Sequence, residues 1–133
     1  MLKKIFIMAV VFTALIVGCA NDDDPITSTS NNSNKSPNAP SNPTPMDSAT
    51  NVSYSFVTLY WMCSDPDPTD TLRYDVYYGG NLSTTNLLVS NTLNTSADLG
   101  VCQPHTKIYW KVVAKDFKGG TTQGPVWRFT TSY

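Results

Sequence analysis

Large apolar side chains occupy every second position in three separate stretches of this 133-residue chain, at 57–63, 72–78 and 108–114. Successive side chains of a β-strand point to opposite faces, so this period predicts strands that bury one face each. In the second stretch, Arg73, Asp75 and Tyr77 are then expected to face outward. The side chains predicted to form the core are Leu59, Trp61, Tyr74, Val76, Trp110, Val112 and Trp127.

Shorter candidate strands lie at 86–90, 94–99 and 126–131, and Gly, Pro, Asn and Asp separate the segments. Nothing after residue 18 has a helical period. Six or seven short strands with turn residues about every 8–12 positions predict an all-β fold, a sandwich of two sheets.

Residues 1–18 predict an export signal. Lys3 and Lys4 precede 14 apolar or small residues, Ile5–Gly18, whereas a membrane-spanning helix needs about 20. Cys19 follows Ile16, Val17 and Gly18, which resembles the lipobox of bacterial lipoproteins. The resemblance implies that the mature chain begins at Cys19 and is held at the membrane by lipid on that thiol. The alternative is an ordinary secretory signal with an incidental cysteine.

The next segment predicts a tether. Residues 20–45 contain almost no large apolar side chain beyond Ile26, so they are expected to be disordered or extended. We place a Ser/Asn/Pro-rich tether at 19–37 and one folded domain at 38–133. The run Asn21–Asp24 resembles the acidic tag that sends some lipoproteins to the outer face of the outer membrane, and a solvated acidic patch is the alternative. The expected location is the cell envelope, with a lipid anchor in the outer membrane and, if the acidic run acts as a tag, display at the cell surface.

Several motifs in the folded part resemble a bacterial fibronectin type III domain over about residues 38–133. The resemblance implies a seven-stranded, immunoglobulin-like sandwich with Trp61 in strand B, Tyr74 and Val76 in strand C, and Trp110–Ala114 in strand F. The motifs are Pro43-Thr44-Pro45, Leu59-Tyr60-Trp61, Ser64-Asp65-Pro66-Asp67, Tyr74-Asp75-Val76-Tyr77-Tyr78, Tyr109–Asp116 and Gly124-Pro125-Val126-Trp127.

One departure from the family concerns the residues before strand F. The family pattern Leu-x-Pro-x-Thr-x-Tyr is here Cys102, Pro104, Thr106 and Ile108, so either the tyrosine corner is missing or the strand register differs from this alignment. By the same alignment Cys63 and Cys102 lie at opposite ends of the sandwich. A disulfide needs Cα atoms within about 7 Å, so two buried, unpaired thiols are predicted.

The composition argues against several functions. After removal of residues 1–18, seven basic residues face ten acidic ones, which offers nothing to a nucleic-acid backbone. Glutamate is absent and His105 is the single histidine. It lies in a predicted surface turn with no sign of a nucleophile or an orienting partner, and one histidine with two separated cysteines cannot make a zinc cage. The expected protein is not an enzyme.

Asp65, Asp67 and Asp70 fall in one short loop, and the fold is expected to bring Asp116 to the same end. Clustered carboxylates suit calcium, although Asp-Pro pairs nucleate turns equally well. No other cofactor is expected. Exposed aromatic rings could bind carbohydrate or simply pack across strands. The candidate rings are Tyr54, Tyr60, Tyr77, Tyr109 and Phe117.

The favoured function is a non-catalytic lipoprotein that presents its domain to a protein or glycan. A passive spacer or accessory subunit of an envelope complex is the alternative, and a calcium-dependent carbohydrate-binding module is a further one. Asp47-Ser48-Ala49 and Asp70-Thr71-Leu72 also resemble acceptors of a periplasmic O-glycosylation system.

Overall fold

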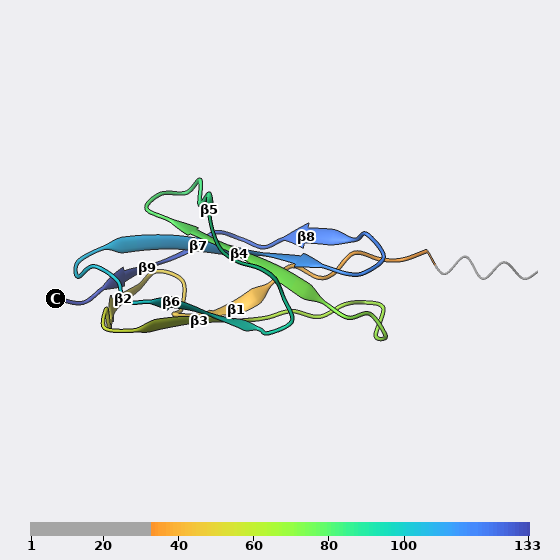
Figure 1. The fold of residues 1–133 in the computed structure, drawn as a ribbon, viewed down its shortest axis with the longest axis horizontal. Coiled ribbons are helices and arrows are strands. Elements are labelled where there is room, and N and C mark those ends of the chain that lie inside the picture. The colour runs from red at the N-terminus through yellow and green to blue at the C-terminus, as the bar shows by residue number, and fades with distance from the viewer. Residues whose placement is uncertain (1–32) are drawn as a thin grey trace, which may run out of the picture. The chain divides into compact units, whose positions relative to one another are not determined.

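The computed structural model describes residues 33–133, which form nine β-strands and no helix (Figure 1). The predictions for the export signal, Cys19 and Asn21–Asp24 lie outside these residues. Within the described part, no helix has the length and apolar character needed to span a membrane. The strands are β1 Ser41–Thr44, β2 Ala49–Val52, β3 Val57–Met62, β4 Arg73–Gly79, β5 Asn86–Thr92, β6 Ser96–Gly100, β7 Lys107–Lys115, β8 Thr121–Gln123 and β9 Trp127–Thr131.

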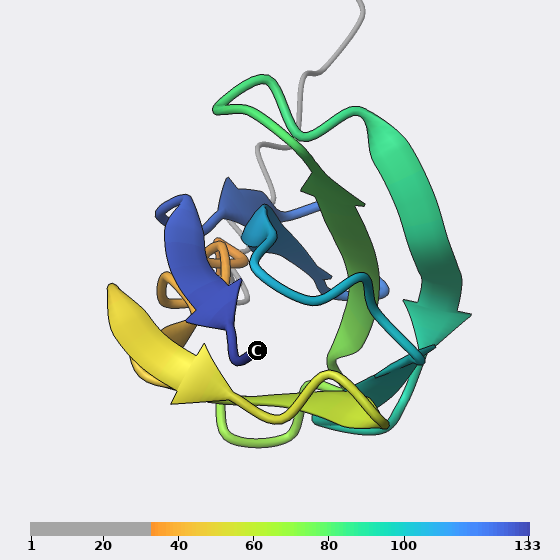
Figure 2. The ribbon, with the colours of Figure 1, turned by 90° about the vertical axis from the view of Figure 1, so that its left-hand side faces the viewer.

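Two sheets face each other, as Figure 2 shows from the end at which the C-terminus lies. One sheet has the order β1-β3-β6, and the other has the order β2-β9-β7-β4-β5 with β8 beside β7. All pairs are antiparallel except β2 with β9. This confirms the predicted all-β sandwich.

The count of nine instead of seven arises because the first and last strands are each interrupted. The first part of the chain pairs with β3 as β1, then changes sheet and pairs with β9 as β2. The last strand is interrupted at residues 124–126, where Pro125 lacks an N–H for the ladder and Gly124 donates to the Val112 carbonyl at 2.8 Å. The strand Ser41–Thr44 also corrects the expectation that all of 20–45 is tether.

The burial of the core side chains confirms the predicted alternation of inward and outward positions. All seven predicted core residues are at most 5% exposed, and Val57, Ile108, Ala114 and Phe129 join them. Trp61 meets Tyr74 edge to face at 5.4 Å between ring centroids, and Trp110 lies against Trp127 at 4.7 Å. Such aromatic contacts add stability beyond the area that they bury.

Asp75 lies on the outward face, as predicted, but it is only 6% exposed. Its side chain lies on the outer face of its sheet and forms an ion pair with Lys115 from the neighbouring strand. The Asn91 N–H and the Ser90 hydroxyl donate to its Oδ1 at 2.8 and 3.0 Å. The stem of a long lysine and the edge strand β5 thus bury a position that alternation alone assigns to water.

Cys63 and Cys102 are free, as predicted, but they are half-buried instead of buried. Cys63 follows the last residue of β3, whereas Cys102 follows the end of β6, where Gly100 pairs with Val57, the first residue of β3. Burial raises the pKa of both thiols, which favours the unreactive protonated form.

Ile108 takes the inward position where the family has its tyrosine, and Tyr109 lies on the opposite face. The adjoining turn is instead tied to β9 through the buried Thr131. Its hydroxyl donates to the Gln103 carbonyl at 2.7 Å and accepts from the Thr106 N–H at 2.8 Å. Thr131 thus links the turn before β7 to the last strand, and no pattern in the sequence predicts this role.

Candidate functional site

The predicted acidic cluster exists at one end of the sandwich. We call this the acidic end. It consists of the β3–β4 loop, the β7–β8 turn and residues 34–37, the entry segment, through which the chain enters the domain (Figure 1). One oxygen from each of Asp65, Asp67 and Asp70 lies within 4.8 Å of the other two. These carboxylates are close enough to share one small cation.

Local bonds shape the β3–β4 loop. The Asp67 N–H donates to Asp65 Oδ1 at 2.8 Å, an Asx turn, and the Asp70 N–H donates to the Asp67 carbonyl at 2.9 Å. Asp67 Oδ2 also accepts from the Lys35 N–H at 2.7 Å. Turn chemistry, the alternative reading of the Asp-Pro pairs, therefore accounts for part of this loop but leaves other carboxylate oxygens free.

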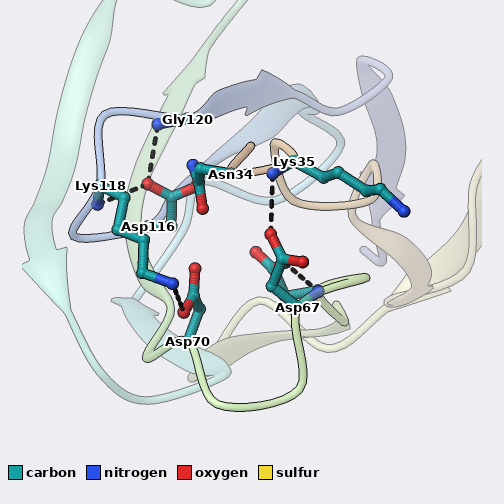
Figure 3. Close-up of polar contacts among 8 residues, drawn as sticks. Asn34, Lys35, Asp67, Asp70, Asp116, Lys118 and Gly120 are labelled. Atoms are coloured by element: carbon teal, nitrogen blue, oxygen red, sulfur yellow. Dashed lines mark hydrogen bonds and ion pairs between the residues drawn. The ribbon is translucent and has the colours of Figure 1, made fainter. Parts of the chain in front are cut away.

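Asp116 comes to the same end, as expected, but its carboxylate is already occupied (Figure 3). Oδ1 accepts from the Lys118 and Gly120 N–H groups at 2.8 and 2.7 Å, and Oδ2 accepts from Asn34 Nδ2 at 2.8 Å. The Asn34 amide and these backbone donors lower the pKa of Asp116. Asp116 is thus a turn residue that positions Asn34, and it lies outside the group of three.

Lys118 supplies the positive charge in contact with the cluster. Its Nζ lies 2.6 Å from Asp70 Oδ1, and this bond raises the pKa of the lysine. Neither Lys118 nor Asn34 was predicted as a site residue, although Lys118 follows Asp116 by only two positions, a spacing that could have indicated it.

Three oxygens at the acidic end are buried and have no hydrogen-bond partner among residues 33–133: Asn34 Oδ1, Asp65 Oδ2 and Asp70 Oδ2. Buried polar atoms are nearly always satisfied by protein, water or an ion. Two segments far apart in the sequence, the entry segment and the β3–β4 loop, therefore present unsatisfied hard acceptors at one end of the fold.

The opposite end is apolar, and we define the apolar end by Tyr54, Phe56, Val101 and the turn before β7. Tyr54 is 37%, Phe56 61% and Val101 75% exposed. The Cys102 N–H donates to the Tyr54 carbonyl at 2.9 Å, which holds these two loops together. A hollow of about 290 Å³ opens beside them, lined by Tyr78, Gly79, Leu99, Val101, Cys102 and Ile108 among others.

The remaining aromatic candidates do not gather on one surface. Tyr60 is exposed on β3, and Tyr109 is half-buried on β7. Phe117 lies under the Arg73 guanidinium at 4.7 Å. Tyr77 lines a hollow of about 320 Å³ on the outer face of the larger sheet, beside Lys111 and Gln123, which are hydrogen-bonded at 3.2 Å. His105 is exposed at the apolar end and packs edge-on against Tyr133.

No protein-family model matches the chain, and a search of curated proteins found no match. Solved structures are similar to it, among them the following two. The fibronectin type III domain of human fibronectin type III domain containing protein 3 has a TM-score of 0.54 and 20% identity, with 74% of this chain and 88% of that one covered. Streptomyces avermitilis alpha-L-rhamnosidase, complexed with L-rhamnose, has a TM-score of 0.52 and 15% identity, with 73% of this chain and 10% of the enzyme covered. At these identities the likeness concerns the fold, and the described part of this chain has the fold of a fibronectin type III domain.

Proposed function

We propose that this protein is a non-catalytic binding module of the bacterial cell envelope, anchored by lipid on Cys19 and binding a protein partner through its apolar end. The observation that carries the proposal is the separation of the two ends. The described chain enters the sandwich at the acidic end, whereas Phe56 and Val101 are exposed at the other. A tether that joins at the acidic end leaves the apolar end free to meet a partner.

The chemistry of the apolar end suits a protein surface better than a glycan. Phe56 and Val101 present aliphatic and aromatic area next to a hollow of about 290 Å³, large enough to take an apolar side chain. Fibronectin-type sandwiches host many unrelated functions, so the argument depends on this surface and not on the fold.

The test is crosslinking in cells that carry the full chain with a photoreactive residue at position 56 or 101, compared with the same probe at position 62. Met62 is 61% exposed, like Phe56, but lies on β3 at the other end of that strand. A crosslinked protein seen from 56 and 101 and not from 62 supports the proposal. Equal crosslinking from all three positions, or none, favours the passive spacer.

The anchor has its own test. Replacing Cys19 with alanine is expected to move the protein from the membrane fraction to the soluble envelope fraction, and the intact mass of the native protein should exceed that of residues 19–133 by the acyl groups. If the mass shows no lipid on Cys19, the anchor proposal is wrong and the protein is an ordinary secreted domain. The same mass spectrum reports sugar at Ser48 or Thr71, and display at the cell surface is tested by protease added to whole cells.

A further inference from the structure

We propose that the acidic end is a Ca²⁺ site in which Asn34 Oδ1, Asp65 Oδ2 and Asp70 Oδ2 are ligands, with Asp67 beside them. The proposal goes beyond the binding function of the apolar end and does not depend on it. Its consequence is that extracytoplasmic calcium fixes the junction between the entry segment and the sandwich.

The first argument is the state of the oxygens. All three are buried and lack a hydrogen-bond partner within the part of the chain that the structure describes, and the Asp70 side chain is only 4% exposed. An unsatisfied buried carboxylate oxygen is among the most costly groups that a fold can hold. Asn34 strengthens the argument because it is neutral and belongs to a different segment. Its amide nitrogen is fixed on Asp116, which leaves the carbonyl oxygen to face the β3–β4 loop (Figure 3).

The second argument is the charge balance. Asp65, Asp67 and Asp70 bring three negative charges within 4.8 Å, and Lys118 pairs with one oxygen of Asp70. The lysine therefore offsets one charge, and no other cation of the described residues forms an ion pair with Asp70 Oδ2, Asp65 or Asp67. A divalent ion would complete the balance.

The ligand set selects the kind of ion. Carboxylate and amide oxygens are hard donors, and the three-carboxylate group contains no histidine or thiol that would favour zinc or copper. An irregular loop plus a distant amide suits the flexible coordination of calcium, whereas magnesium demands a near-ideal octahedron. Water molecules would complete the shell.

Glycine at position 120 allows the entry segment to reach the site. A Cβ at Gly120 would lie 2.9 Å from Ser36 Cα and would collide with the Asp116 carboxylate. The β7–β8 turn thus accepts residues 34–36 because this position has no side chain.

The test is isothermal titration calorimetry of CaCl₂ into the full chain, purified in detergent and stripped with chelator. We expect one site with a Kd of about 0.1–1 mM, the range of extracellular calcium modules, and weaker binding of Mg²⁺. Asp70→Asn should weaken binding at least tenfold, and Asn34→Ala several-fold. Asp98→Asn is the matched control, because Asp98 is an exposed carboxylate on β6 that accepts a hydrogen bond from the Thr58 hydroxyl on β3. Lys118→Met should tighten binding, because it removes the competing cation.

The melting temperature provides a second readout that detects misfolded variants. Calcium at a hundred times Kd should raise it by roughly 10 °C in the unmodified chain, and by far less in Asp70→Asn. Absence of both heat and a melting shift at 10 mM CaCl₂, in the unmodified chain and in Lys118→Met, would overturn the proposal. Equal binding by Asp70→Asn and the unmodified chain would also overturn it, as would equal losses in Asp98→Asn and Asp70→Asn.

Discussion

The two ends of this sandwich are built in opposite ways. At the acidic end, side chains from three segments hold the loops together, and three of their oxygens have no hydrogen-bond partner among the residues that the structure describes. At the apolar end, backbone bonds and the Thr131 hydroxyl join the loops, while Phe56 and Val101 stay exposed. The acidic end presents polar oxygens that can bind a ligand, and the apolar end presents exposed apolar side chains.

This comparison indicates that one sandwich can carry two kinds of binding surface at its opposite ends. A charged ligand is favoured where acceptors are buried without partners, and a protein partner is favoured where apolar area faces water. Both ends depend on one core that runs between them, so changes in the core, at each end and at the control sites should have distinct consequences.

The largest expected effect is in the shared core. Trp110 is fully buried against Trp127, so Trp110→Ala should destabilise the domain by about 4 kcal/mol. Both ends should lose protection together in hydrogen exchange, because they share this core. Independent melting of the acidic end would show that the two ends are separate cooperative units.

Asp75 is the satisfied counterpart of the acidic end, since its buried carboxylate has an ion pair and two further donors. Asp75→Ala should cost about 3 kcal/mol, measured by urea unfolding, because it leaves Lys115 and the Asn91 N–H without their partner. Calcium should not restore this loss. Recovery by calcium would mean that Asp75 belongs to the proposed ion site.

The pH dependence of the same residue follows from its contacts. Burial would raise the pKa of Asp75, but Lys115, the Asn91 N–H and the Ser90 hydroxyl outweigh it and lower the pKa below 3.8. A lowered pKa contributes stability above the unfolded-state value, and this contribution disappears as the pH falls through the folded value. The free energy of unfolding of the unmodified chain should therefore fall more steeply with decreasing pH below about pH 4. The free energy of unfolding of Asp75→Asn should depend less on pH in this range.

A substitution at Thr131 tests how the loops of the apolar end are held together. Thr131→Val keeps the shape but leaves the Thr106 N–H and the Gln103 carbonyl without the hydroxyl, at a cost of about 2 kcal/mol in chemical unfolding. Calcium affinity should not change, because the residue lies at the other end. A fall in calcium affinity equal to that of Asp70→Asn would contradict the separation of the ends.

Much of the fold could be predicted from the sequence because strand alternation is a local property. The positions of Leu59, Trp61, Val76 and Trp110 in the core follow from it directly. Alternation placed Asp75 on the correct face but did not predict its burial, because it states which face a residue occupies and not whether neighbouring side chains cover that face. The interrupted first and last strands also depend on which sheet each half joins, which is a tertiary choice.

The acidic site was predictable only in part. Asp65, Asp67 and Asp70 are neighbours in the chain, and the topology brings Asp116 near them. Asn34 could not be found this way, since it meets Asp116 across 82 positions and lies in a segment whose composition predicts a tether. Long-range polar contacts depend on side-chain geometry, which leaves no period in the sequence.

The smallest expected effect is at the point where the entry segment meets the β7–β8 turn. Gly120→Ala should destabilise the domain by about 1 kcal/mol, since the exposed turn and residues 34–36 can move apart. Calcium affinity should nevertheless fall several-fold, because that movement withdraws Asn34 from Asp65 and Asp70. Gly119→Ala is the matched control: it strains a positive φ of 98° but meets no atom within 4 Å, so it should lower stability without the same loss of calcium affinity. If both variants weaken calcium binding equally, Asn34 is not a ligand and the acidic loop alone holds the ion.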